Sequence, residues 1–117
     1  MFSENRLAVI RKSSEIDAIR KEGRSFSNRY VVLVTKKRAA AVPQYALIAS
    51  RTVGGAVERN RCKRRMRSRV TMLSPGLVDD YDFILIARQG LLTASPDTLD
   101  NAFTKLFRTA GLINPNE

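Results

Sequence analysis

Residues 54–67 read GGAVERNRCKRRMR, and this stretch decides how the rest of the chain is interpreted. Seven of the twelve residues from Glu58 to Arg69 are Lys or Arg, and Glu58 is the only acid among them. No Pro or Gly occurs between residues 56 and 73, which predicts a helix there, and the two preceding glycines can supply a turn into it. At about 100° per residue, its apolar side chains form one narrow stripe: Cys62, Met66, Val70 and Leu73. Arg69 borders the stripe and can lay its aliphatic stem along it.

The like charge on this helix is unusual for a solvated surface. Two basic series repeat at i,i+4 along it: Arg59, Lys63 and Arg67, and then Arg61, Arg65 and Arg69. Such pairs each cost roughly a few tenths of a kcal/mol, and nothing in the segment compensates them. RNA phosphates would compensate them, and arginine binds phosphate in a bidentate manner and stacks on bases. The alternative is a solvated face that only confers solubility.

The composition narrows the classes of protein. A length of 117 residues with 44% hydrophobic residues suits one domain with a single core. A net charge of +10 favours a nucleic acid as partner over an anionic membrane, because the basic segment lacks a face of Trp, Phe and Leu side chains that could enter lipid. Cys62 is the only cysteine and there is no histidine, so a disulfide and the commonest general base are both excluded. With no apolar run of roughly 18 to 20 residues and no signal peptide, we expect a cytoplasmic protein with no membrane association.

The remaining pattern predicts an α+β protein, a single RNA-binding domain over residues 1–117 whose segments 1–12 and 112–117 are irregular. Ser13 or Ser14 is expected to cap a helix that Gly23 ends, and Ser95 a helix that Gly111 ends. Apolar or β-branched runs predict strands over 24–27, 29–35, 45–50 and 82–87. The order is therefore αβββαβα, with helices against one sheet and the strands on either side of the basic helix able to pair in parallel.

Residues 57–67, VERNRCKRRMR, resemble the "RNR" helix signature of the protein subunit of bacterial ribonuclease P. The resemblance extends over nearly the whole chain through shorter stretches: Asn5-Arg6-Leu7, Gly23 with Asn28-Arg29, Ser50-Arg51 before Gly54, residues 83–88 (FILIAR), and Leu106-Phe107-Arg108. The resemblance implies an α-β sandwich of the ribosomal protein S5 domain 2-like kind. It also implies a left-handed β-α-β crossover around the RNR helix, an exception to the usual right-handed rule.

The same resemblance implies a function. The protein binds a catalytic RNA subunit and the single-stranded 5′ leader of precursor tRNA, and no protein partner is required. The RNA, with Mg²⁺ that it binds mainly itself, hydrolyses the precursor to leave the mature 5′ end of the tRNA. The protein contributes no catalytic residue, and whether it holds an ordered metal is left open.

Site residues follow from the resemblance by position. Contacts to the catalytic RNA are expected from Arg51, Arg59, Asn60, Arg61, Lys63, Arg64, Arg67 and Arg88. The leader-binding cleft, between the first helix and the sheet, is expected to include Ile16, Arg20, Phe26, Arg29, Tyr30 and Val34. An aromatic pair common in the family is replaced here by Ile16 and Arg20, and an aromatic on the long strand by Val34. The cleft is therefore expected to rely on Arg20, Arg29, Phe26 and Tyr30, although Phe26 and Tyr30 also suit a core.

Several residues have more than one interpretation. Asn60 either makes a local backbone contact near the helix start or a fixed contact to RNA or a hydrated metal. Cys62 is expected in the core, and Asp79, Asp80 and Asp82 in turns or caps instead of a metal site. Two other functions compete with the ribonuclease P assignment. One is a ribosomal or other RNA-binding protein with the same sandwich; the other is an autonomous nuclease, for which the sequence shows no convincing set of acids, bases or ligands.

Overall fold

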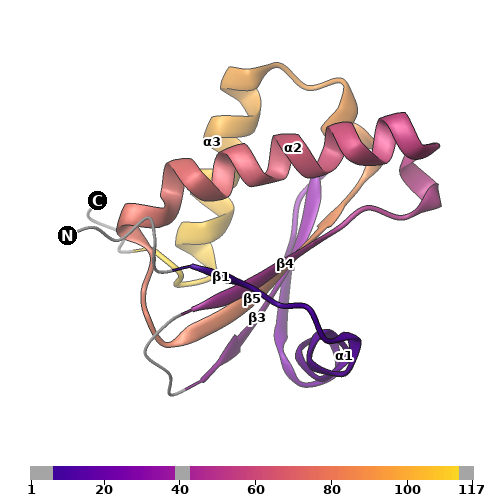
Figure 1. Cartoon of the computed structure of the whole chain (residues 1–117). Helices are drawn as coiled ribbons and strands as arrows, with labels where there is room; N and C mark the ends of the chain where they lie inside the picture. The colour runs from indigo at the N-terminus through magenta and orange to yellow at the C-terminus, as the bar shows by residue number, and fades with distance from the viewer. Residues whose placement is uncertain (1–6, 39–42, 114–117) are drawn as a thin grey trace.

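The apolar stretch at residues 81–87 lies at the centre of a five-stranded sheet (Figure 1). The computed structural model describes residues 7–38 and 43–113. Strand β5 (Tyr81–Ala87) pairs antiparallel with β3 (Val31–Lys37) on one side and parallel with β4 (Gln44–Ile48) on the other. β1 (Ala8–Val9) and β2 (Arg24–Ser27) form the two edges, in the order β1-β4-β5-β3-β2. The continuous apolarity of β5 fits this position, because a central strand is covered on both faces.

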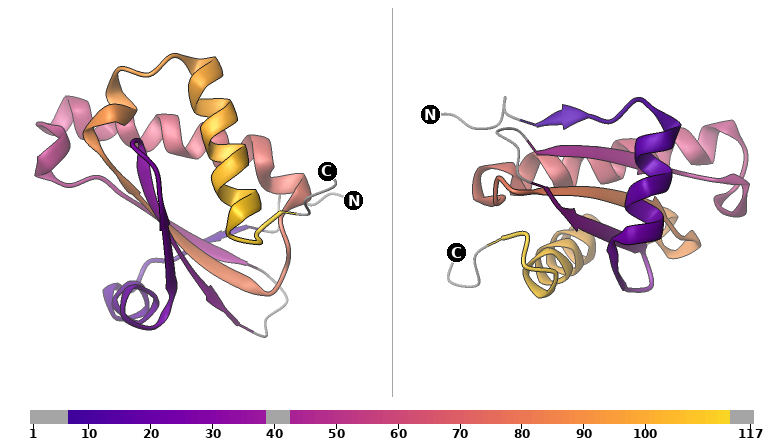
Figure 2. Two further views of the ribbon diagram at one scale, coloured as in Figure 1. Left: turned by 180° about the vertical axis from the view of Figure 1, so that it is seen from behind. Right: turned by 90° about the horizontal axis from the view of Figure 1, so that it is seen from below.

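Helix α1 (Ser13–Glu22) covers one face of the sheet, as the view from below in Figure 2 shows. It closes a small core of buried side chains: Ile10, Ile19, Val34, Ala46 and Ile84. Gly23 follows the helix as predicted, and a Cβ there would lie 2.5 Å from the carbonyl oxygen of Thr35. The predicted serine cap is wrong, because Lys12 occupies the N-cap position and makes no side-chain capping bond.

Helices α2 (Ala56–Leu73) and α3 (Pro96–Thr109) cover the opposite face (Figures 1 and 2). The predicted stripe on α2 is confirmed, since Cys62, Met66 and Val70 are at most 1% exposed. On α3, Ser95 is the N-cap as predicted, and its Oγ accepts a hydrogen bond from Thr98 N at 3.2 Å. This face contains the larger core, so α2 is held by its apolar stripe while its other side stays outward.

The link from β4 into α2 depends on two residues of the opening sequence. After the short 3₁₀ helix η2 (Arg51–Val53), Gly54 has φ of 133°, and a Cβ there would lie 2.7 Å from Glu58 Cβ. The carboxylate of Glu58 accepts a hydrogen bond from Gly55 N at 2.9 Å, so the only acid of the basic segment caps the helix start. The β4–α2–β5 unit joins parallel neighbours as predicted, and its left hand stays a prediction.

The structure corrects the two segments predicted to be irregular. Ala8 and Val9 form β1, which pairs in parallel with β4. Leu112 and Ile113 are buried, and Ile113 forms an isolated bridge with Leu77. Both contacts join segments distant in sequence, so local pattern gave no signal for them. Residues 1–6 and 114–117 of these segments lie outside the described residues, as do residues 39–42; the family-like Asn5 and Arg6 are among them.

Several strand boundaries differ by one or two residues from the prediction; for example, β3 ends at Lys37 and β5 begins at Tyr81. β3 begins at Val31 instead of residue 29, because Asn28 Oδ1 accepts hydrogen bonds from Tyr30 N at 2.8 Å and Val31 N at 3.0 Å. This side-chain turn between β2 and β3 holds residues 28–30 outside the ladder. β4 ends at Ile48, two residues before the predicted end.

Candidate nucleic-acid interface

The outward side of α2 carries a cluster of side chains that we call the cationic face: Arg59, Asn60, Arg61, Lys63, Arg64 and Arg67. Asn60, Arg61, Arg64 and Arg67 are exposed, whereas Arg59 and Lys63 are half-buried. Within the described part of the chain, none of the five basic side chains forms an ion pair. The side chain of Asn60 likewise makes no hydrogen bond to a described residue, so the local backbone contact is not found. The face therefore presents uncompensated positive charge to solvent.

The other two arginines of the segment turn toward the protein. Arg65 donates to the carbonyl oxygens of Leu91 at 2.8 Å, Leu92 at 3.1 Å and Ala94 at 2.6 Å. These carbonyls belong to the 3₁₀ helix η4 (Gln89–Leu92) and to the connection from it to α3. Burial lowers the pKa of Arg65, and the positive charges of Arg69 and Arg61 lower it further. Arg65 thus fixes α2 against the segment that follows β5.

Arg69 acts one turn later in the same way. Its side chain is buried, with Nε 3.2 Å from Asp100 Oδ1 and a hydrogen bond to the carbonyl oxygen of Pro96 at 3.2 Å. The prediction that nothing within the segment compensates the repulsion concerned α2 alone, and these partners of Arg65 and Arg69 lie outside α2. Protein groups compensate Arg65 and Arg69, and the charge left open belongs to the cationic face.

Three further arginines gather beyond the N-terminal end of α2. Arg51 is exposed on η2, and Arg88, directly after β5, donates to the carbonyl oxygen of Asn28 at 3.0 Å. Arg29 and Arg88 line one pocket of about 340 Å³ together with Thr52. The structure thus places Arg29, expected in the leader cleft, beside residues expected to contact the catalytic RNA.

The six predicted cleft residues do not share one surface. Ile16 and Arg20 lie on α1, but Val34 beneath it is only 6% exposed, so its side chain is a core residue instead of a contact to RNA. Phe26 and Tyr30 pack against the core on the α2 and α3 side of the sheet.

Sequence reasoning missed an apolar row beside α1. Val32, Ile86 and Ile48 are partly buried neighbours in register across β3, β5 and β4. They lie two residues along their strands from Val34, Ile84 and Ala46, which α1 covers, so they point to the same face. Residues two apart on a strand share a face, so each predicted strand placed these residues beside Val34, Ile84 or Ala46. Only the order of the strands shows that the three lie side by side.

A pocket of about 200 Å³ connects the two regions around the sheet edge. Its lining includes Ile16 of α1, Val9 of β1, and Lys63 and Arg67 of the cationic face. The pocket therefore brings apolar side chains of α1 and β1 together with basic side chains of α2.

The remaining reactive groups serve the fold. Cys62 is fully buried, and burial raises the pKa of its thiol, which suits the predicted core role. Asp82 is 5% exposed, forms an ion pair with Arg38 and accepts from Gln44 N at 3.1 Å, in place of the predicted turn or cap role.

Across residues 7–38 and 43–113, no three His, Cys, Asp or Glu side chains gather as a metal site would need. The described helices include none that is long and apolar enough to cross a membrane.

Comparison with known proteins agrees with this geometry. A family model described as Ribonuclease P matches residues 5–111. The ribonuclease P protein component of Symbiobacterium thermophilum is 39% identical over 93 residues, which cover 79% of this chain and 81% of that protein. The component from Chloroflexus aurantiacus is 33% identical over 97 residues, covering 83% of this chain and 67% of that one. A solved structure of the Staphylococcus aureus RNase P protein matches with a TM-score of 0.81 at 26% identity, covering 91% of this chain and 97% of that chain. Since the family model spans nearly the whole described fold, the chain belongs to the ribonuclease P protein family.

Proposed function

We propose that the cationic face of α2 binds the catalytic RNA of ribonuclease P, with Arg51, Arg88 and Arg29 as contacts at its N-terminal end. Membership of the family implies a ribonucleoprotein endoribonuclease with an RNA partner. The observation that carries the proposal is the division of the basic residues on α2. Arg65 and Arg69 are bound by protein groups, whereas the outward basic side chains have no ion pair in the described structure, although Arg59 donates to the carbonyl oxygen of Gly54 at 3.3 Å. Guanidinium groups that no carboxylate neutralises, on a rigid helix, suit phosphates of a folded RNA.

The second part of the proposal concerns precursor tRNA. We assign its single-stranded 5′ leader to the apolar row of Val32, Ile86 and Ile48, with Ile16 and Arg20 of α1 at its side. The row offers bases a flat apolar surface, and Arg20 is exposed and can meet the leader backbone. The pocket shared by Ile16, Lys63 and Arg67 would then lead from the leader to the catalytic RNA.

The chemistry belongs to the RNA in this proposal. The catalytic RNA, with Mg²⁺ bound mainly by its own phosphates, hydrolyses the precursor to leave the mature 5′ end. The protein lacks histidine, and its fully buried thiol is no nucleophile, so its contribution is to bind and position both RNAs. A cytoplasmic location remains the prediction from the sequence.

A reconstitution tests the function. The protein is mixed with its catalytic RNA and a precursor tRNA at low Mg²⁺, and release of the 5′ leader is measured beside mixtures that lack either the protein or the catalytic RNA. We expect the protein to accelerate cleavage by the RNA and to cleave nothing alone. No acceleration would contradict the proposal, and cleavage by the protein alone would indicate an autonomous nuclease.

A pair of variants separates the two RNA contacts. Ile86→Ser makes the apolar row polar, and we expect weaker binding of precursor tRNA with a leader but unchanged binding of tRNA without one. Stacking of a base on an aromatic ring contributes about 1–3 kcal/mol, and an aliphatic contact contributes less, so a loss of up to about fivefold is expected. The exposed Val57→Ser on α2 is the matched control. An equal loss for both tRNAs would remove the apolar row from the leader site.

A further inference from the structure

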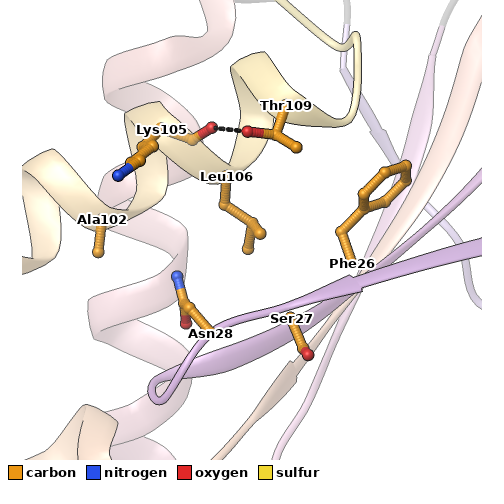
Figure 3. Close-up of a pocket in the computed structure, with 7 residues that line it drawn as sticks. All are labelled: Phe26, Ser27, Asn28, Ala102, Lys105, Leu106 and Thr109. Carbon is orange, nitrogen blue, oxygen red and sulfur yellow. Dashed lines mark hydrogen bonds between the residues drawn. The ribbon is translucent and has the colours of Figure 1, made fainter.

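A second pocket lies on the opposite face of the sheet from α1, between edge strand β2 and the C-terminal half of α3 (Figure 3). Its volume is about 360 Å³, within the range of roughly 300–1,000 Å³ that small-ligand pockets occupy. Seven residues line it: Phe26, Ser27, Asn28, Ala102, Lys105, Leu106 and Thr109. Apart from Phe26, none of them belongs to the interface described above.

The pocket combines an apolar lining with one fixed hydrogen-bond donor. Phe26 projects from β2, and Leu106 and Ala102 point toward the strand from α3, with Ala102 at the end near Asn28 (Figure 3). The Asn28 side-chain oxygen accepts from Tyr30 N and Val31 N, which fixes the orientation of the amide. Its nitrogen therefore points toward α3 (Figure 3), and no described residue accepts a hydrogen bond from it. A donor held in this way selects a ligand with an acceptor at its edge.

The charges around the pocket are positive. Lys105 is the only charged residue of the lining and is exposed. On β2, the Arg24 guanidinium lies 5.3 Å from the centre of the Phe26 ring. A second copy of this chain carries a net charge of +10 and would be repelled, whereas a planar ligand that bears a phosphate matches each feature.

We propose that this pocket binds one unpaired nucleotide of an RNA strand. Its base lies against Phe26 and Leu106, an acceptor on the base meets the amide nitrogen of Asn28, and its phosphate lies near Lys105 and Arg24. Unstacked bases of single-stranded RNA are recognised in this way, by apolar contact and edge hydrogen bonds. The inference rests on the proposed function in taking RNA as the partner, and it adds a contact on the face of the sheet away from the leader.

Nuclear magnetic resonance of the ¹⁵N-labelled full chain tests the site directly. The probes are adenosine 5′-monophosphate and, as the control without a base, ribose 5-phosphate. We expect the nucleotide to shift amide signals of residues 26–28 and 102–109, and ribose 5-phosphate to leave these signals in place. Equal shifts with both probes, or nucleotide shifts confined to α1 and α2, would overturn the proposal. Shifts in this region that grow with protein concentration alone would assign the pocket to self-association and would also overturn it.

Two variants sharpen the result, and the spectrum of each reports whether it is folded. Ala102→Leu fills the pocket from α3 and should weaken nucleotide binding there about fivefold or more, the range of base stacking. Asn101→Leu, at the exposed neighbouring position, is the matched control and should bind as wild type does. Lys105→Gln should weaken binding about twofold, as expected for one exposed charge. Unchanged binding in Ala102→Leu would overturn the proposal.

Failure of this inference is distinguishable from failure of the proposed function. If the catalytic RNA binds and cleavage is accelerated while the pocket signals ignore the nucleotide, only the pocket assignment is lost. If the pocket binds the nucleotide while the catalytic RNA is not bound, the proposed function is lost and the pocket assignment stands.

Discussion

Replacing Arg65 by methionine separates the structural arginines of α2 from those that face solvent. The methionine keeps much of the aliphatic stem but removes the donors to three carbonyl oxygens, those of Leu91, Leu92 and Ala94. Arg64 is its neighbour in sequence, is exposed and makes no ion pair in the described structure. Arg64→Met therefore removes the same charge from the same helix without breaking a contact.

The expected magnitude follows from the contacts. Hydrogen bonds to a charged group contribute about 1.5–3 kcal/mol each, so three at the low end total about 4.5 kcal/mol. Part of this stabilisation is regained, because the variant no longer buries a charge that Arg69 and Arg61 repel. The site is also half-buried, so water can hydrogen-bond to the carbonyl oxygens that lose their donor. We expect Arg65→Met to lower the free energy of unfolding by roughly 2–3 kcal/mol, and Arg64→Met to change it by less than about 0.5 kcal/mol.

Urea unfolding followed by circular dichroism measures both values. With a slope of about 1–3 kcal/mol/M, the midpoint of Arg65→Met should fall by about 0.7–3 M. Arg65→Lys should recover only part of the loss, because one ammonium cannot reproduce a planar fork of donors. A wild-type midpoint for Arg65→Met, or an equal loss for Arg64→Met, would refute the division of the arginines.

Three other predictions concern the fold. Asp82→Ala should lower the free energy of unfolding by about 2 kcal/mol. This is less than the roughly 3–5 kcal/mol for a fully buried pair, because the Arg38 side chain is 37% exposed. A stability within error of wild type would exclude the Arg38–Asp82 pair as a stabilising contact. Gly54→Ala should cost about 1–3 kcal/mol in urea unfolding, since φ of 133° is strained for alanine, and a neutral result would mean that the turn adopts another conformation. Cys62 should resist a thiol reagent until the protein unfolds, and rapid labelling of the folded protein would contradict its burial. Because burial raises the pKa of its thiol above the ordinary 9.0, the free energy of unfolding should fall as pH rises through 9.0, more steeply than in Cys62→Ala.

The sequence predicted the elements whose signal is periodic. The bounds of α2 and its buried stripe agree with the structure because 18 residues contain no helix breaker and the apolar positions repeat. β5 was found because a run of apolar residues of that length suits a central strand. The sequence does not predict β1, because two residues are too few to show a periodic pattern and the strand forms only by pairing with β4.

The site was only partly predictable for a related reason. Arg64 and Arg65 are the same residue type at adjacent positions, and only the tertiary structure places carbonyl groups beside one of them. A weak signal existed, because Arg65 precedes Arg69 by one turn and so lies on the same border of the apolar stripe. The grouping of Arg29 with Arg88, and the apolar row beside α1, both required the strand order.

The salt dependence of binding to the catalytic RNA tests the central claim most directly. Association constants are measured over a series of salt concentrations for wild type, for Arg64→Ala plus Arg67→Ala, and for Lys12→Ala plus Lys21→Ala, which removes equal charge from exposed sites outside α2. If the cationic face holds phosphates, the α2 variant flattens the slope of log K against log salt by about one to two, and the control changes it less. An unchanged slope in the α2 variant, or an equal change in the control, would contradict the assignment of the cationic face to RNA.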